Sequence, residues 1–153
     1  MLKIFLIVAG VGVLGWVVTM ILFSVLAKEP DSLGVKDGRL AACPSSSNCV
    51  GSAEQDTSHA IEALTFTDGP DEAWRRLEGV VAKHPRTRVI TNQDGYLHAE
   101  CKSFLFRFVD DLEFLLDREG KKIEVRSASR AGRGDLGVNR ARVEAMRAAL
   151  GGP

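Results

Sequence analysis

The chain begins with a long run of apolar residues, which precedes segments that alternate at the periods of strands and helices. Residues 4–27 contain no charged side chain. Roughly 24 residues at a rise of 1.5 Å suffice for a helix that crosses a hydrocarbon core of about 30 Å. The pattern predicts a transmembrane helix, with residues 1–28 as the membrane anchor. A cleaved signal peptide is the alternative, because residues 25–27 end in Ala27, a small residue of the kind found at cleavage sites.

A polar segment follows the apolar run. Residues 29–58 are rich in Gly, Pro, Ser and Asp and show neither the helical nor the strand period. This composition predicts an irregular arm. Residues 59–153 are then assigned to one α+β domain.

Two amphipathic helices are expected in that domain. Gly69-Pro70-Asp71-Glu72 is typical of a helix start, with proline in the first turn and acidic residues near the positive end of the helix dipole, and Pro85 marks the end of this helix. The second helix is expected to begin at Asn139, a favoured N-cap residue, and its apolar stripe comprises Val143, Met146 and Leu150.

Alternation of apolar and polar residues predicts strands at residues 61–67, 87–91, 96–102, 109–117 and 121–130. If Glu119-Gly120 is a tight turn, Phe114 faces Val125 on the core side and Glu113 faces Arg126 on the other side. The order is strand, helix, four strands, helix. Because each helix has one apolar stripe to bury, this order predicts an antiparallel sheet of four or five strands with both helices on one face.

Two classes of ligand, nucleic acids and dinucleotides, are not favoured by the sequence. The chain has 20 Lys and Arg against 20 Asp and Glu, and a balanced charge argues against a nucleic-acid partner. Gly10, Gly12 and Gly15 have the spacing of a dinucleotide-binding turn, but the segment that follows is apolar on every side. A dinucleotide-binding helix needs a polar face, so no cofactor is predicted.

The cysteines bear on the compartment. Cys43 and Cys49 flank a short Pro-Ser-Ser-Ser-Asn segment that could close as a disulfide loop, and such bonds persist in oxidising compartments. A pair of reduced thiols is the alternative. Zinc needs about four ligands and only His59 is near in sequence, so no metal site is predicted. Cys101 lies on the apolar side of its strand and is expected to be a buried thiol.

Two signals disagree on orientation. Lys28, Lys36 and Arg39 follow the apolar run, whereas only Lys3 and the free amine precede it, which favours a cytoplasmic domain. The cysteine pair favours the opposite side. The sequence is interpreted as a single-pass inner-membrane protein with its soluble domain in the periplasm.

One strand face carries candidate acid–base chemistry. His98, Glu100 and Asp111 share a face with Glu113, Arg126 and Arg130. A histidine beside carboxylates serves as an acid–base pair or a metal ligand in many sites, but the same residues also form ordinary cross-strand ion pairs. No H-x-x-x-H, H-E-x-x-H or G-x-S-x-G string supports catalysis. These three residues are therefore weak catalytic candidates, and a non-catalytic protein is favoured.

The segment from Arg126 to Arg140 carries a second set of polar candidates. Gly132, Gly134 and Gly137 permit positive φ, and a loop that meets a helix N-terminus can hold an anion, here with Arg130 and Arg140 as donors. Asp135 could instead occupy those donors internally. We expect one hydrogen-bonded cluster of a structural or ligand-binding kind, with Ser127 and Ser129 on its core side, comprising Arg126, Arg130, Asp135, Asn139 and Arg140.

Several long strings resemble a known family. They are C-P-S-S-S-N-C-V-G-S at residues 43–52, Y-L-H-A-E at 96–100, F-V-D-D-L-E-F at 108–114 and R-S-A-S-R-A-G-R-G-D-L-G-V-N-R at 126–140. In these strings the chain resembles bacterial domain-of-unknown-function family number 1499, over residues 33–150. That family has no established activity, so the resemblance implies membership and no reaction.

These observations together favour one function and leave an alternative. We expect a membrane-anchored, non-catalytic envelope module that binds a protein partner, such as an accessory subunit of a membrane complex. The alternative is a protein that binds a small anionic envelope metabolite, or a hydrolase or isomerase that acts on one.

Overall fold

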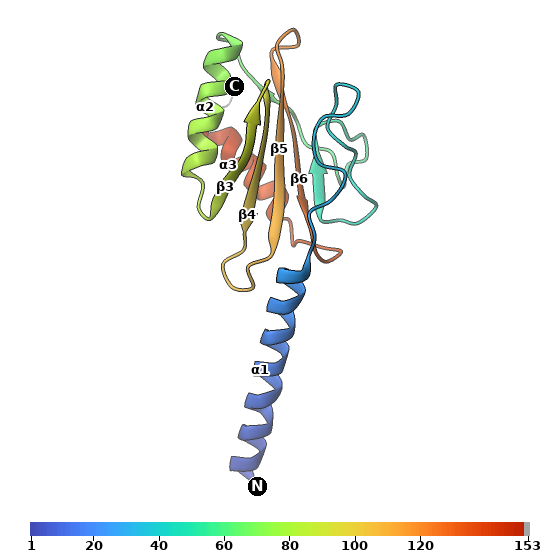
Figure 1. Cartoon of the computed structure of the whole chain (residues 1–153), viewed down its shortest axis with the longest axis vertical. Helices are drawn as coiled ribbons and strands as arrows, with labels where there is room; N and C mark the ends of the chain where they lie inside the picture. The colour runs from blue at the N-terminus through green and yellow to red at the C-terminus, as the bar shows by residue number, and fades with distance from the viewer. Residues whose placement is uncertain (152–153) are drawn as a thin grey trace.

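The computed structural model describes residues 1–151 and places one long helix beyond the end of an α+β domain (Figure 1). This helix, α1, spans Leu2–Leu26, and Ser24 is its one buried residue. Its mean hydropathy reaches 2.5 and it carries few charges, so it is long and apolar enough to cross a membrane. α1 is therefore a candidate single-pass anchor.

The domain is built on one antiparallel sheet. Its strands are β1 (Cys49–Gly51), β2 (Leu64–Thr65), β3 (Thr87–Gln93), β4 (Tyr96–Lys102), β5 (Val109–Asp117) and β6 (Lys122–Ser129). The order across the sheet is β1-β6-β5-β4-β3, and β2 also pairs with β6. The predicted α+β class with an antiparallel sheet is confirmed. One strand, β1, comes from the arm that the sequence pattern left irregular, and the first predicted strand is shorter than expected.

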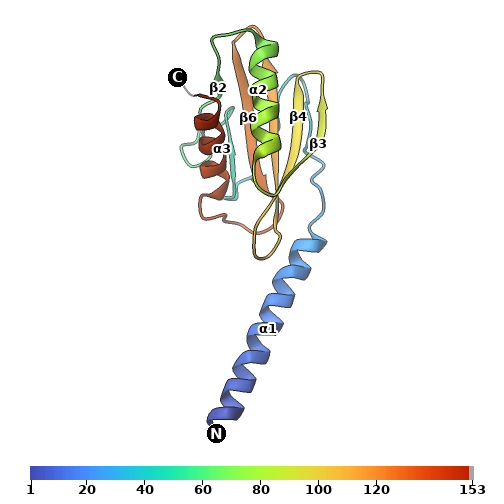
Figure 2. The same cartoon turned by 90° about the vertical axis from the view of Figure 1, so that its left-hand side faces the viewer.

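Helices α2 (Pro70–Lys83) and α3 (Val138–Ala149) cover the same face of the sheet (Figure 2). Leu77 and Val81 of α2, and Val143 and Met146 of α3, are all 1% exposed or less. They belong to one core with the inward side chains of the central strands, which are Leu97, Ala99, Cys101, Leu112, Phe114, Ile123 and Val125. The prediction that both helices lie on one face is confirmed.

The register of the β5–β6 hairpin also follows the sequence prediction. Phe114 pairs with Val125, and Glu113 pairs with Arg126. Phe114 is fully buried on the helix side. Strand register is strongly specified here because a slip of one residue would place Phe114 and Val125 on the polar face.

The start of α3 differs from the prediction. The helix begins at Val138, after Gly137 in the left-handed region at φ 79°, so Asn139 lies inside the first turn. The cap comes from Asp135, whose Oδ2 accepts a hydrogen bond from the Asn139 N–H at 2.8 Å and whose Oδ1 accepts from Gly137 N–H at 3.0 Å. Positive φ at Leu136 and Gly137 turns the chain back so that the carboxylate reaches these amides. The side chain of Asn139 is thereby left for buried contacts.

The arm, residues 29–58, lies along the sheet face that the helices leave open. The backbone N–H of Gly34 donates to Glu113 Oε1 at 2.9 Å, across 79 residues of sequence. Further along, β1 pairs with β6 through Cys49 and Ala128. The second face of the sheet is therefore covered, in part, by the segment that joins α1 to the domain.

Candidate functional site

The catalytic candidates form one buried, ion-paired group on the arm side of the sheet. His98 Nε2 lies 2.8 Å from Asp111 Oδ1. Arg130 donates to both oxygens of Asp111, from Nε at 2.8 Å and from Nη2 at 2.6 Å. Nη2 also lies 2.9 Å from Glu100, which Arg88 contacts at 3.1 Å. We call His98, Glu100, Asp111 and Arg130 the sheet-face network.

The electrostatics of this network keep its carboxylates ionised. Burial raises the pKa of Asp111, but hydrogen bonds from Arg130 and His98 outweigh it and leave that pKa below its ordinary value. Burial acts on Glu100 in the same way, and its partners Arg88 and Arg130 again lower the net pKa. A general acid or base works best with a pKa near the operating pH. The pKa values of Asp111 and Glu100 are instead lowered, away from neutral pH. Both carboxylates therefore stay charged and bind the neighbouring cations.

A second buried pair extends the network toward the arm. Arg126 Nη1 donates to Glu113 Oε2 at 2.9 Å, while Glu113 Oε1 accepts from the Tyr96 hydroxyl at 2.9 Å. Burial and the neighbouring Glu113 carboxylate raise the pKa of Tyr96 well above its ordinary value, so the phenol stays protonated and donates. His98 is 3% exposed and Glu113 is fully buried. Both side chains are therefore shielded from bulk solvent.

A separate network lies on the helix side of the sheet. Ser127 Oγ donates to Asn139 Oδ1 at 2.6 Å, and Arg142 Nη1 donates to the same oxygen at 2.7 Å. Arg142 Nη2 reaches Asp110 Oδ2 at 2.5 Å. Asn139 Nδ2 donates to Ser129 Oγ and to the backbone oxygen of Asn48, both at 3.0 Å. This helix-side network comprises Asn48, Asp110, Ser127, Ser129, Asn139 and Arg142.

The prediction that the polar candidates of residues 126–140 form a single cluster is wrong. Successive residues of a strand face opposite sides of a sheet, so Arg126 and Arg130 point to the arm side while Ser127 and Ser129 point to the helices. Asp135 caps α3, as described above. Arg140 donates instead to the backbone oxygen of Ser58, at 3.2 Å. The predicted residues divide into two networks, one helix cap and one contact with the arm.

The sequence reasoning missed three members of the helix-side network. Arg142 lies between Asn139 and Val143 on the buried side of α3 and is 8% exposed. Its position on the apolar stripe is the signal that could have identified it, because a charged residue there needs a buried partner. Asp110 and Asn48 had no comparable signal: they meet Arg142 and Asn139 only after the sheet and arm assemble.

The predicted disulfide is present. Cys43 and Cys49 are joined by an S–S bond of 2.00 Å. The bond holds the chain next to β1, where Asn48 Nδ2 donates to the backbone oxygen of Gly132 at 2.9 Å. Cys101 is a free, buried thiol, as predicted. Burial raises the pKa of this thiol, which disfavours the nucleophilic thiolate.

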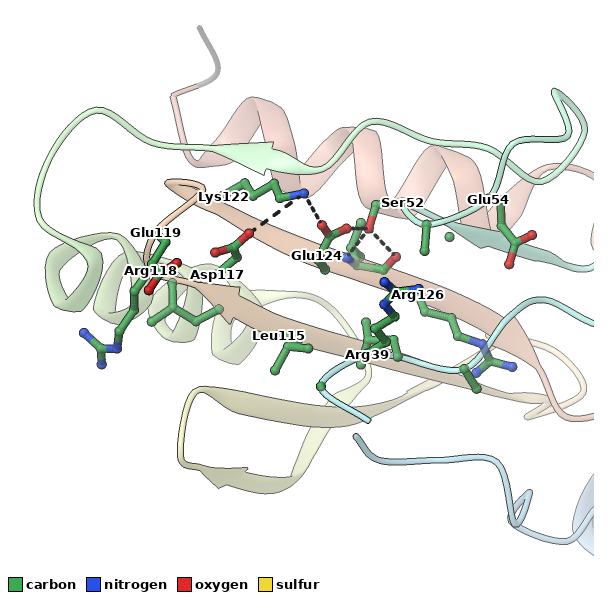
Figure 3. Close-up of a pocket in the computed structure, with 17 residues that line it drawn as sticks. Arg39, Ser52, Glu54, Leu115, Asp117, Arg118, Glu119, Lys122, Glu124 and Arg126 are labelled. Atoms are coloured by element: carbon green, nitrogen blue, oxygen red, sulfur yellow. Dashed lines mark hydrogen bonds and ion pairs between the residues drawn. The ribbon is translucent and has the colours of Figure 1, made fainter. Parts of the chain in front are cut away.

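A groove of about 640 Å³ lies between the arm and the β5–β6 hairpin (Figure 3). Lys122 forms ion pairs there with Glu124 at 2.6 Å and with Asp117 at 3.9 Å. Ser52 also hydrogen-bonds to Glu124. Arg39 of the arm lines the groove, is exposed, and forms no ion pair within residues 1–151. Charges of both signs line this groove, and Arg39 is the lining cation without an ion pair in the part of the chain that the structure describes.

Arg126 also lines the groove, and its guanidinium is incompletely satisfied. Nη1 is bound to Glu113, but Nε is buried and has no hydrogen-bond partner among the described residues. Buried donors in proteins are nearly always paired. An acceptor oxygen that entered this end of the groove would supply the missing partner.

Within residues 1–151, no group of three or more His, Cys, Asp or Glu side chains is arranged to hold a metal ion. Comparison with family models matches residues 39–150 to a family described as "Protein of unknown function (DUF1499)". No curated protein and no solved structure matches the chain.

Proposed function

We propose, from the premise that the chain belongs to the DUF1499 family of proteins of unknown function, that it is a membrane-anchored, non-catalytic binding module of the cell envelope. Its role is to contact a protein partner, as an accessory subunit of a membrane complex does. The observation that carries the proposal is that the charged side chains of the sheet-face network are buried and bound to one another.

Asp111 already holds His98 and both donors of Arg130, and Asp111 is 1% exposed. Releasing His98 for proton transfer would take a hydrogen-bond partner from the buried Asp111 carboxylate, and a buried polar group left unsatisfied costs about 1–3 kcal/mol. These residues therefore stabilise the sheet. Binding through the surface, rather than catalysis on this face, fits a domain built in this way.

The disulfide supports a periplasmic location. The Cys43–Cys49 bond persists in an oxidising compartment and is rare in the cytosol. With α1 as an inner-membrane span, the domain would then lie outside the cytoplasmic membrane. A partner would be an envelope protein or a membrane complex rather than a cytosolic one.

The test is purification of the native chain in a mild detergent, followed by mass spectrometry of what remains bound. We expect a stoichiometric protein partner. The matched control is residues 1–28 fused to an unrelated soluble domain, which identifies proteins that bind the anchor alone. Recovery of a lone monomer, or of the same proteins with the control, would overturn the proposal.

A small-anion binder is the second candidate, and one observation favours it. Among residues 1–151, Arg126 Nε–H has no hydrogen-bond partner and Arg39 has no ion pair, and both residues line the same groove. Both guanidinium groups suit a carboxylate or phosphate ligand, since arginine forms strong charge-assisted hydrogen bonds with such anions.

Thermal unfolding of the full chain in detergent with a panel of carboxylates and phosphates tests this candidate. A ligand that binds the folded state raises the melting temperature in a saturable way. The shift should be reduced in Arg39→Gln and retained in Arg75→Gln, an exposed arginine on α2 that lies outside the groove. If no compound shifts the transition, or if both variants respond equally, the groove is not an anion site.

A further inference from the structure

The loop between β4 and β5 exposes an unusual amount of apolar surface. Residues 103–108 read Ser-Phe-Leu-Phe-Arg-Phe. The side chains at its tip are largely in the open, with Phe104 79% exposed and Leu105 66% exposed. Loops at the surface of a soluble domain are normally polar, and contiguous exposed apolar residues mark a contact with a protein or a membrane.

This loop lies at the end of the domain from which α1 departs, in both views (Figures 1 and 2). Phe106 packs edge-on against Trp16 of α1, with 5.3 Å between the ring centroids. Phe108 lies behind it, 5.8 Å from Phe106. The loop is therefore in direct contact with the side of the candidate membrane helix.

The position of Trp16 sets the depth of this contact. α1 has 25 residues, so it is about 37 Å long, and Trp16 lies about 15 Å from its C-terminal end at 1.5 Å per residue. A hydrocarbon core of about 30 Å leaves about 7 Å of such a helix outside. Even if all of that excess lay at the C-terminal end, Trp16 would start about 8 Å inside the apolar layer. Because the Phe106 ring packs against the Trp16 ring, Phe106 lies at the same depth as the side chain of Trp16.

The loop is held in this shape by its own hydrogen bonds. The backbone N–H of Ser103 donates to the oxygen of Phe108 at 2.9 Å, and Ser103 Oγ accepts from the Phe108 N–H at 2.9 Å. Arg107 adopts a positive φ of 60°, which closes the turn. Phe104 and Leu105 thus project from a closed loop. Their exposure is a property of the fold.

The residues around the loop match the chemistry of a bilayer surface. Leu136, in the loop between β6 and α3 at the same end of the domain, is fully exposed. Arg86 lies over the ring of Phe104 at 5.8 Å. The exposed arginines Arg86, Arg107 and Arg133 form no ion pair within the described residues. Exposed Phe and Leu with Arg beside them suit the boundary between acyl chains and headgroups, where the apolar side chains enter the lipid and the cations meet anionic headgroups.

We propose that residues 103–108 form a second membrane contact, in which Phe104 and Leu105 insert into the leaflet on the domain's side of the membrane. Arg86, Arg107 and Arg133 then lie at the level of the headgroup phosphates. The occupant of this apolar surface is lipid, because the neighbouring Phe106 already shares the depth of Trp16. The inference rests on α1 as a membrane span and goes beyond the proposed function, since it concerns how the domain sits on the bilayer whatever it binds.

The experiment uses the full chain in vesicles of phosphatidylethanolamine and phosphatidylglycerol. Leu105→Cys is labelled with an environment-sensitive fluorophore. The native cysteines do not compete, because Cys101 is buried and Cys43 is paired with Cys49. The control is Glu119→Cys, at the turn between β5 and β6 at the opposite end of the domain (Figure 1).

We expect the label at Leu105 to be quenched by lipid-borne nitroxides and protected several-fold from aqueous iodide, relative to the label at Glu119. Adding Phe104→Ser should reduce the lipid quenching without unfolding the chain, because Phe104 is exposed. If iodide reaches both labels equally, the loop is outside the bilayer. Protection from iodide without lipid quenching would mean that a protein, or a second copy of the chain, covers the loop. Either result would overturn the inference while leaving the partner-binding proposal untouched.

Discussion

At the scale of single residues, the chain uses buried carboxylates as anchors for arginines. Asp111 is the clearest case, because its two oxygens accept from Arg130 and His98 while it is 1% exposed. Glu113 does the same for Arg126 and Tyr96. A buried carboxylate of this kind is tolerated because a cation and a second donor are bound to it.

Removing the Asp111 carboxylate should therefore be costly. We expect Asp111→Ala to lower the free energy of unfolding by about 3–5 kcal/mol, because Arg130 is left buried beside His98 without its main acceptor. Urea unfolding measured by circular dichroism checks this. Asp71→Ala is the control, since Asp71 pairs with Arg118 on the surface and should change little. Equal effects of the two variants would contradict a buried role for Asp111.

The lowered pKa values of Asp111 and Glu100 predict an acid-linked loss of stability. A carboxyl whose folded-state pKa lies below its unfolded value of about 4 stabilises the fold above that pH, and the contribution is lost as the pH falls through the folded-state pKa. We expect the free energy of unfolding to fall below about pH 4. Asp111→Asn should be less stable at neutral pH and should show a shallower acid dependence. Parallel pH profiles for the two proteins would contradict the prediction.

Asp135 is expected to contribute less to the free energy of unfolding than Asp111. Its carboxylate caps α3 by accepting from the backbone N–H groups of Gly137 and Asn139, and it pairs with no arginine among the described residues. We expect Asp135→Ala to cost about 0.5–2 kcal/mol, the usual range for loss of a helix cap. Asp135→Asn should recover most of that loss. A cost as large as that of Asp111→Ala would mean that Asp135 supports more than the cap.

At the scale of elements, the arm completes the sheet. Its strand β1 pairs with β6 and brings Asn48 against Asn139, across 91 residues of sequence. The disulfide limits the freedom of the segment just before β1. The arm is consequently part of the folded domain from β1 onward, although its composition resembles that of a linker.

Opening this disulfide should weaken the domain. We expect the double variant Cys43→Ser, Cys49→Ser to lose about 2–4 kcal/mol of stability, since the cross-link restricts the unfolded chain. A reducing agent should lower the stability of the natural chain by a similar amount and leave the double variant unchanged. Thermal unfolding with and without reductant measures both. An effect of reductant on the double variant would point to another cause.

At the scale of the whole molecule, α1 and the loop of residues 103–108 define one end of the protein, and the β5–β6 turn and the groove beside it lie farther from that end (Figures 1 and 3). The domain therefore has a side that faces α1 and a side that faces away. With α1 in a membrane as proposed, the side that faces away from α1 would be the one open to a partner.

The proposed orientation makes a direct prediction. A reporter fused after Pro153 that is active only outside the cytoplasm should be active, because the domain would follow α1 across the membrane. A reporter that works only in the cytosol serves as the matched control and should be silent. The reverse pattern would reject the periplasmic location, and a soluble product that begins at Lys28 would reject the anchor.

The sequence by itself determined most of the elements and their faces, although it missed β1. Local periodicity placed both domain helices, and the alternation in β5 and β6 specified the pairing of Phe114 with Val125, because a one-residue slip would bury charges and expose the core. The apolar run indicated α1 for a similar reason. These features depend on residues a few positions apart in the chain, so the local pattern of apolar and polar residues predicts them.

Only the tertiary structure decided which polar groups meet. Arg126 and Ser127 are adjacent in sequence but belong to different networks on opposite faces of the sheet, and the partner of Arg142 is Asp110, 32 residues away. The contact between Gly34 and Glu113, like that between Asn48 and Asn139, forms only when the arm docks. Hydrogen bonds between residues this far apart depend on how the sheet, the helices and the arm pack together, and no local period in the sequence encodes that packing.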